Sequence, residues 1–203
     1  MTAARRRFAR SALAAGLVVL AAAWLGPLPY LTAGSFAAHM ALHMAVVAMA
    51  APLLALGLVR GEGAGEGMPA WAPLAASFLE LAVIWAWHTP ALHTLARADA
   101  MGLAAEQASF LGVSLVVWIA ALAAAQPGGR RSAGAFAGAG ALAFTAMHMT
   151  MLGVAIALSP RLLCRTPTEG PTLLGVDALR DQEAGAILML AVGGAVHLAG
   201  ALA

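Results

Sequence analysis

Lysine is absent from the sequence, cysteine occurs once, and charged residues make up only 10% of the chain. With Cys164 alone, the chain has neither an internal disulfide nor a Cys-x-x-Cys metal or redox site. The basic residues are all arginines, and nothing in their distribution resembles the basic, aromatic-interleaved surface of a nucleic-acid-binding protein. Hydrophobic residues account for 62% of the sequence, which excludes an ordinary soluble domain.

Long apolar runs make up most of the sequence and predict a single all-helical domain over residues 1–203, a bundle of transmembrane helices. Each run is close to the roughly 20 residues that a helix needs to cross a bilayer. The breaks between the runs contain glycine, proline and glutamate, which are typical of loops. The predicted spans, about six in number, cover residues 11–31, 35–59, 72–93, 102–125, 134–158 and 179–202.

Four arginines, Arg5, Arg6, Arg7 and Arg10, precede the first apolar run. This pattern also occurs in signal peptides, but the run exceeds their usual core of roughly 7–15 residues and lacks a clear Ala-x-Ala exit. An uncleaved first helix is therefore the favoured interpretation. The positive-inside rule then places the N-terminus in the cytoplasm, and an even number of spans returns the C-terminus to the same side.

The most informative stretch begins the second span, where His39-Met40 is followed one helical turn later by His43-Met44. In a helix these side chains lie on neighbouring parts of one face. Imidazole and thioether are neutral ligands that soft or borderline metals accept, Cu(I) in particular. Because a polar side chain in an apolar span is costly, the pattern indicates a metal-binding function.

Ligand-type and acidic residues elsewhere fall at a similar predicted depth, towards the outer leaflet. His88 ends the third predicted span on the outer side, and Glu106 and Asp181 begin the fourth and sixth there. His148 lies about ten residues, or about 15 Å of helical rise, from the outer end of the fifth. His197 is excluded because it falls near the cytoplasmic end of the last span.

The predicted metal site therefore combines residues from five spans. The predicted ligands are His39, His43, His88, His148, Met40, Met44, Met147 and Met151. The residues expected to orient the imidazoles by hydrogen bonds are Glu106, Asp181 and Gln182. His93, just past Pro90, and Cys164, in the long outer loop, are additional candidates.

Each of these residues also has a purely structural interpretation. A single histidine in a membrane helix often forms an interhelical hydrogen bond, and a single methionine often only packs. Asp181 and Glu106 can stabilise the positive ends of their own helices. Glu80 lies deeper than the other acids and is a candidate for function or for pairing, with no assignable partner. The coincidence of so many such residues at one depth is what favours a site.

Four segments carry recognisable spacings. They are Phe36-x-x-His39-Met40-x-x-His43 leading to Ala51-Pro52-Leu53-Leu54, Trp87-His88-Thr89-Pro90-x-Leu92, Glu106 with Phe110-Leu111 and Trp118, and Asp181-Gln182-x-x-Gly185-x-x-x-Met189. In this order they resemble the CtaG family of cytochrome c oxidase assembly factors. The resemblance extends over most of the chain from Phe36 to Met189.

The resemblance implies a multi-pass protein of the bacterial inner membrane that helps to build haem-copper oxidase and has no enzymatic activity of its own. Besides lipid, its implied partners are the oxidase catalytic subunit and a periplasmic copper donor. The implied cargo is copper, as Cu(I), for the binuclear centre of the oxidase. The residues at the motif positions are His39, His43, His88, Glu106, Asp181 and Gln182.

Copper binding and delivery through a His/Met site is the leading hypothesis, and three alternatives stay open. A membrane electron-transfer protein would use His43 with His88 or His148 as the two axial ligands of a haem. A metal permease would line a path with the buried polar residues. A structural oxidase subunit would have no metal requirement.

Overall fold

The computed structural model describes residues 2–62, 69–125, 131–164 and 172–203, and over these ranges it contains helices and no strands. Five helical segments are long and apolar enough to cross a membrane, and a sixth apolar helix is shorter. The predicted fold class, a transmembrane helix bundle with about six spans, is confirmed.

Several spans are built from more than one helical element. The elements are α1 (Ala3–Leu25), α2 (Leu28–Leu31), α3 (Phe36–Met44), the π-helical segment η1 (Ala45–Ala50), α4 (Ala51–Glu62), α5 (Ala72–Trp87), α6 (Pro90–Ala98), α7 (Ala100–Ala124), α8 (Arg131–Ala157), α9 (Ala178–Leu188), the π-helical segment η2 (Met189–Gly193) and α10 (Gly194–Leu202).

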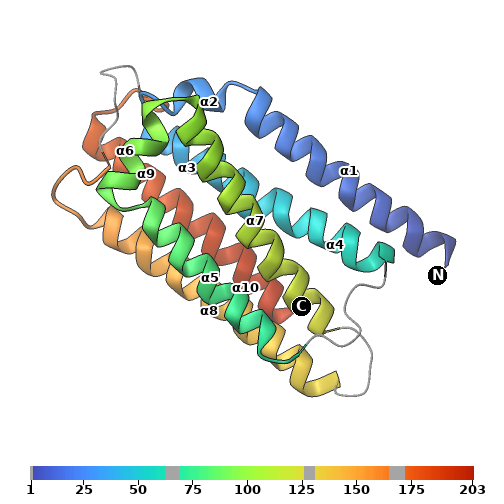
Figure 1. The fold of residues 1–203 in the computed structure, drawn as a ribbon. Coiled ribbons are helices and arrows are strands. Elements are labelled where there is room, and N and C mark those ends of the chain that lie inside the picture. Colours follow the sequence, from blue (N-terminus) through green and yellow to red (C-terminus); the bar gives the residue numbers. More distant parts are fainter. Residues whose placement is uncertain (1, 63–68, 126–130, 165–171) are drawn as a thin grey trace.

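Both chain termini lie at one end of the bundle, and α2, α6 and the first turns of α3 and α9 lie at the opposite end (Figure 1). We call this opposite end the α6 end. Helix α1 occupies one flank and packs along α4, and the α9–α10 segment packs against both α3 and α8. Gly57 of α4 allows the close approach of α1, because a Cβ atom there would collide with Leu13 and the Ala9 carbonyl.

The third predicted span, residues 72–93, is wrong at its outer boundary. Helix α5 ends at Trp87, Thr89 has an extended backbone (φ −68°, ψ 145°), and Pro90 starts α6. The cause is local, because the residue before a proline is sterically excluded from helical backbone angles, whereas proline itself suits the first position of a helix. Helix α6 is therefore separate from α5 and lies across this end of the bundle. The His93 side chain of α6 is buried.

A polar cluster joins three helices in the middle of the bundle. Glu80 of α5 accepts hydrogen bonds from the hydroxyls of Ser114 on α7 (2.6 Å) and Thr145 on α8 (2.9 Å). Ser77, one turn before Glu80, is 2.6 Å from the Thr145 hydroxyl. These side chains are fully buried. Glu80, which had no assignable partner from sequence, therefore links α5 to α7 and α8.

Candidate metal centre

Two histidines of α3 and a glutamate of α7 form the centre of the candidate site. His39 and His43 lie one turn apart, and each presents its Nε2 atom to Oε1 of Glu106, at 3.2 and 3.5 Å. One donor atom from each of the three residues lies within 4.8 Å of the other two. All three side chains are buried. We call this group the carboxylate site.

Two more histidines extend the carboxylate site. The ring of His93 on α6 lies 5.3 Å from that of His39, and the ring of His88, after α5, lies 6.0 Å from that of His43. His88 donates Nδ1–H to the carbonyl oxygen of Ile84 (2.7 Å), which leaves the Nε2 lone pair free. Within the described part of the chain, Nε2 of His88 and of His93 has no hydrogen-bond partner. Both rings are therefore available as ligands.

His93 is uncharged at neutral pH, as a metal ligand must be. Burial is the main reason that its pKa falls to about 2, and the nearby His39 and Arg97 lower it further. A neutral imidazole keeps a lone pair on one ring nitrogen, whereas a protonated one has none. His93, only an additional candidate from sequence, thus lies in the cluster in a suitable form.

Gln107 is a site residue that the sequence reasoning missed. Its Nε2 atom lies 2.8 Å from Nδ1 of His43, and both side chains are buried. An N–H donor at Nδ1 puts the proton of the neutral ring on Nε2. Rotation of the amide by 180° presents its oxygen, which has no partner among the described residues, to Nδ1–H and frees Nε2 for a metal, the arrangement that orients a metal-binding histidine. The sequence did contain a signal for Gln107, because this polar side chain directly follows Glu106 near the start of an otherwise apolar helix.

Arg97 of α6 brings a positive charge close to the cluster. Its guanidinium is only 9% exposed, and its three nitrogen atoms have no hydrogen-bond partner among the described residues. Burial lowers the pKa of Arg97 to about 10, while the carboxylates of Glu106 and Asp181 act in the opposite direction. The side chain therefore remains protonated at neutral pH and adds a cation beside the histidines.

Asp181 and Gln182 were expected to orient the imidazoles, but among the described residues their hydrogen bonds go to other groups. The Asp181 carboxylate accepts hydrogen bonds from the backbone N–H groups of Phe36 (2.6 Å) and Ala37 (3.2 Å). Gln182 Oε1 accepts from the N–H groups of Leu163 (2.8 Å) and Cys164 (3.1 Å). Asp181 thus fixes the start of α3, and Gln182 fixes the backbone at Leu163 and Cys164, which follow α8.

The predicted methionine ligands divide into two groups. Met40 and Met44 are buried beside His43. Met147 and Met151 are 51% and 53% exposed, so the structure does not bring them to the cluster. The reason is helix rotation: these two lie on one face of α8, whereas Met149 points inward and is 1% exposed.

His148 and Cys164 also lie outside the carboxylate site. His148 is buried on α8 and is not part of the group formed by His39, His43 and Glu106, and His197, the histidine excluded by depth, is buried on α10. Cys164 is buried against the core, and burial raises the pKa of its thiol to about 11. The protonated thiol is a poor metal ligand at neutral pH.

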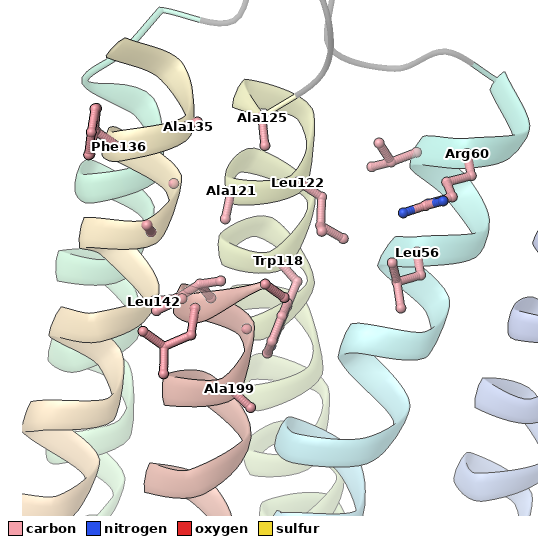
Figure 2. Close-up of a pocket in the computed structure, with 17 residues that line it drawn as sticks. Leu56, Arg60, Trp118, Ala121, Leu122, Ala125, Ala135, Phe136, Leu142 and Ala199 are labelled. Carbon is pink, nitrogen blue, oxygen red and sulfur yellow. The ribbon is translucent and has the colours of Figure 1, made fainter. Parts of the chain in front are cut away.

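A separate pocket of about 820 Å³ opens near the chain termini, between α4, α7, α8 and α10 (Figure 2). Its walls are mostly apolar, with Leu56 and Arg60 on α4 facing Trp118 and Leu122 on α7 and Leu142 on α8. The carboxylate site is at the other end of the bundle. This pocket is therefore separate from the carboxylate site.

Comparison with protein families identifies a family model that matches most of the chain. The sequence model described as cytochrome c oxidase caa3 assembly factor (Caa3_CtaG) matches residues 68–203, which include the third to sixth spans and Glu106. Comparison with curated proteins and with solved structures gives no match.

Proposed function

The chain belongs to the family of cytochrome c oxidase caa3 assembly factors, and on that premise we propose that it binds copper and delivers it to the oxidase. It is a multi-pass membrane protein. In this proposal copper is the cargo and not a permanent cofactor, and the protein catalyses no reaction. The partners are the catalytic subunit of a haem-copper oxidase and a periplasmic copper donor.

The convergence of His39, His43 and Glu106 is the observation that carries the proposal. Two imidazoles and a carboxylate within 4.8 Å of one another form a usual ligand set for a first-row transition metal. A buried, unpaired ring nitrogen costs free energy, and in this cluster His39 Nδ1, His88 Nε2 and His93 Nε2 are buried without a partner in the described residues. A bound cation would use such nitrogens.

The same donor set suits delivery better than permanent storage. Imidazole groups hold Cu(I) without a deprotonated cysteine, so the site needs no closed thiolate shell. His39, His43, His88 and His93 come from three different elements at one end of the bundle, so an ion can change partners among them. The site therefore favours transfer.

The distribution of arginines supports an orientation in the membrane. If the chain termini lie in the cytoplasm, seven arginines fall on the cytoplasmic side and four on the outer side. The α6 end then faces the periplasm in a bacterial inner membrane. Copper would reach the carboxylate site from that side and leave it towards an oxidase subunit within the membrane.

The haem alternative has little support from the packing. The ring of Phe110 lies 4.6 Å from His43 and stacks parallel to His88 at 6.2 Å. The two histidines and Phe110 line a space too narrow for a water molecule. A macrocycle between these histidines would have to displace Phe110 from the core.

Copper binding by the purified protein in detergent tests the proposal. His39→Ala and His43→Ala should each lower the amount of bound copper, and cells that carry either variant should assemble less active oxidase. His197→Ala, which removes a buried histidine near the other end of the bundle, is the matched control and should retain copper. If both His39→Ala and His43→Ala bind as much copper per protein as the wild type, these residues are not copper ligands.

A further inference from the structure

We propose that the protein holds a second metal site next to the carboxylate site and further from the α6 end of the bundle. This second site is selective for a soft monovalent cation such as Cu(I). The inference rests on the proposed copper-handling function and adds a separate set of ligands to it. We call this site the thioether pocket. Its ligand residues are Met40, Met44, Met149 and Met189, with His43 and His88.

The first observation is the gathering of methionines. The four thioether side chains come from α3, α8 and η2, which are far apart in sequence, and line one narrow space. They are between 0% and 4% exposed, whereas Met147 and Met151 on the same bundle are half exposed. Methionine is therefore concentrated beside the two histidines and is not simply spread over the apolar surface.

The second observation concerns the two histidines of the pocket. His88 Nε2 is buried and has no hydrogen-bond partner within the described residues, and His43 Nε2 is buried 3.5 Å from Glu106 Oε1, where the pocket adjoins the carboxylate site. The Nδ1–H group of His88 is already bound to the Ile84 carbonyl, which is the usual arrangement for a histidine whose other nitrogen ligates a metal. Packing of an apolar core alone does not require such nitrogens.

The third observation is the backbone beside the pocket. Met44 immediately precedes η1, and Met189 is the first residue of η2. These π-helical segments contact one another, and short π-helical segments are frequent at functional sites. A Cβ atom at Gly193 of η2 would lie 3.3 Å from Met149 Cε and 3.4 Å from Met44 Sδ. Glycine therefore leaves room for the two methionines to approach.

The chemistry distinguishes the two sites. Thioethers bind soft cations such as Cu(I) and Ag(I) and are poor ligands for harder divalent ions, whereas a carboxylate favours the divalent ions. Glu106 lies in the carboxylate site, and the thioether pocket contains no acidic residue among its described lining residues. His43 belongs to both sites, so a cation can pass from one to the other without leaving the protein.

Titration of the full-length protein in detergent, with Ag(I) as the redox-inert monovalent probe and Co(II) as the divalent probe, tests the inference. Met149→Leu combined with Met189→Leu should weaken Ag(I) binding at least tenfold and leave Co(II) binding unchanged. Met147→Leu combined with Met151→Leu, on the exposed face of α8, is the matched control and should change neither. X-ray absorption of the Cu(I)-loaded protein should show sulfur neighbours that the Met149/Met189 variant lacks.

The outcomes separate this inference from the proposed function. Leucine for methionine nearly conserves volume, and an unchanged circular dichroism spectrum and unfolding temperature will show that the variant folds. If the folded Met149/Met189 variant binds Ag(I) as tightly as the wild type, the thioether pocket is only core packing, while copper binding at the carboxylate site stands. If the wild type binds neither probe, both the inference and the proposed function fail.

Discussion

The hydroxyl of Ser35 donates a hydrogen bond to the carboxylate of Asp181 at 2.8 Å, across 146 positions of the sequence. The same carboxylate accepts the N–H groups of Phe36 and Ala37, and the Ser35 oxygen accepts that of Ala38 (3.1 Å). The first turn of α3 is thus capped by a side chain of α9. The last span thereby fixes the helix that carries His39 and His43.

Removal of this cap should destabilise the protein. Asp181→Ala leaves two buried backbone donors and one hydroxyl without their acceptor, and each unsatisfied group costs roughly 1–3 kcal/mol. We expect a lower unfolding temperature in detergent and weaker copper binding, with a smaller loss for Asp181→Asn, which keeps one acceptor oxygen. Glu183→Ala, in the same helical turn, is the control. Equal stability of Asp181→Ala and Glu183→Ala would contradict the capping role.

Gln107 should matter for metal affinity more than for stability. Gln107→Leu keeps the apolar volume but removes the group that lies 2.8 Å from His43 Nδ1. Partners of this kind typically contribute 10–100-fold to metal affinity, so we expect a loss of about that size in a copper titration. Ser109→Ala, two positions along α7, provides the comparison. If both variants lose the same affinity, the effect comes from α7 as a whole and not from the orientation of His43.

The sequence predicted at which level along the bundle most site residues lie, because a bilayer ties position in a span to depth. The pair His39 and His43 followed from helical spacing alone, and Glu106 was placed at the correct level. Depth does not determine which way a helix is rotated. That is why Met147 was predicted to be a ligand and its neighbour Met149 was overlooked.

Contacts between residues far apart in the chain could not be predicted from the sequence, for a related reason. Asp181 could be read as an acid in the first turn of its own helix, yet Asp177 caps α9 and Asp181 is left to cap α3. The break at Pro90 was visible, but its consequence was not: α6 turns over the cluster and brings His93 and Arg97 into it. Such outcomes depend on how helices pack, for which the chain carries no local signal.

The buried cation at Arg97 should weaken the binding of any metal ion. At an effective dielectric constant of about 20, two unit charges about 10 Å apart interact with roughly 1.7 kcal/mol, or more than tenfold in affinity. Arg97→Gln should therefore tighten copper and Co(II) binding about tenfold. Arg161→Gln removes an exposed arginine of the outer loop and should have little effect. Weaker binding in Arg97→Gln would show that Arg97 supports the site through its contacts and not its charge.

Cys164 should be unreactive in the folded protein. Its thiol is buried and its pKa is raised to about 11, so the reactive thiolate is scarce at pH 7. A maleimide should label Cys164 only after unfolding, whether or not copper is present. Cys164→Ser should keep the copper stoichiometry of the wild type. Rapid labelling of the folded apo-protein that copper suppresses would instead make the thiol a ligand.

Glu80 offers a test between a structural and a transport function for the buried acids. Its two carboxylate oxygens accept the hydroxyls of Ser114 and Thr145, so Glu80→Leu leaves both hydroxyls without this acceptor. We expect a loss of roughly 1–3 kcal/mol, because each hydroxyl can turn partly towards a carbonyl of its own helix. Glu80→Gln should lose less, since an amide can accept from one hydroxyl and donate to the other.

Copper binding should be unchanged in the folded Glu80→Gln protein, because Glu80 lies two helical turns, or about 12 Å of helical rise, before His88. A permease would behave differently, because a buried acid on its pathway would be needed for flux. Metal uptake into proteoliposomes separates the two interpretations. Flux in the wild type that disappears in Glu80→Gln at unchanged unfolding temperature would favour permeation, whereas the structural role of Glu80 requires that the substitution affects stability alone.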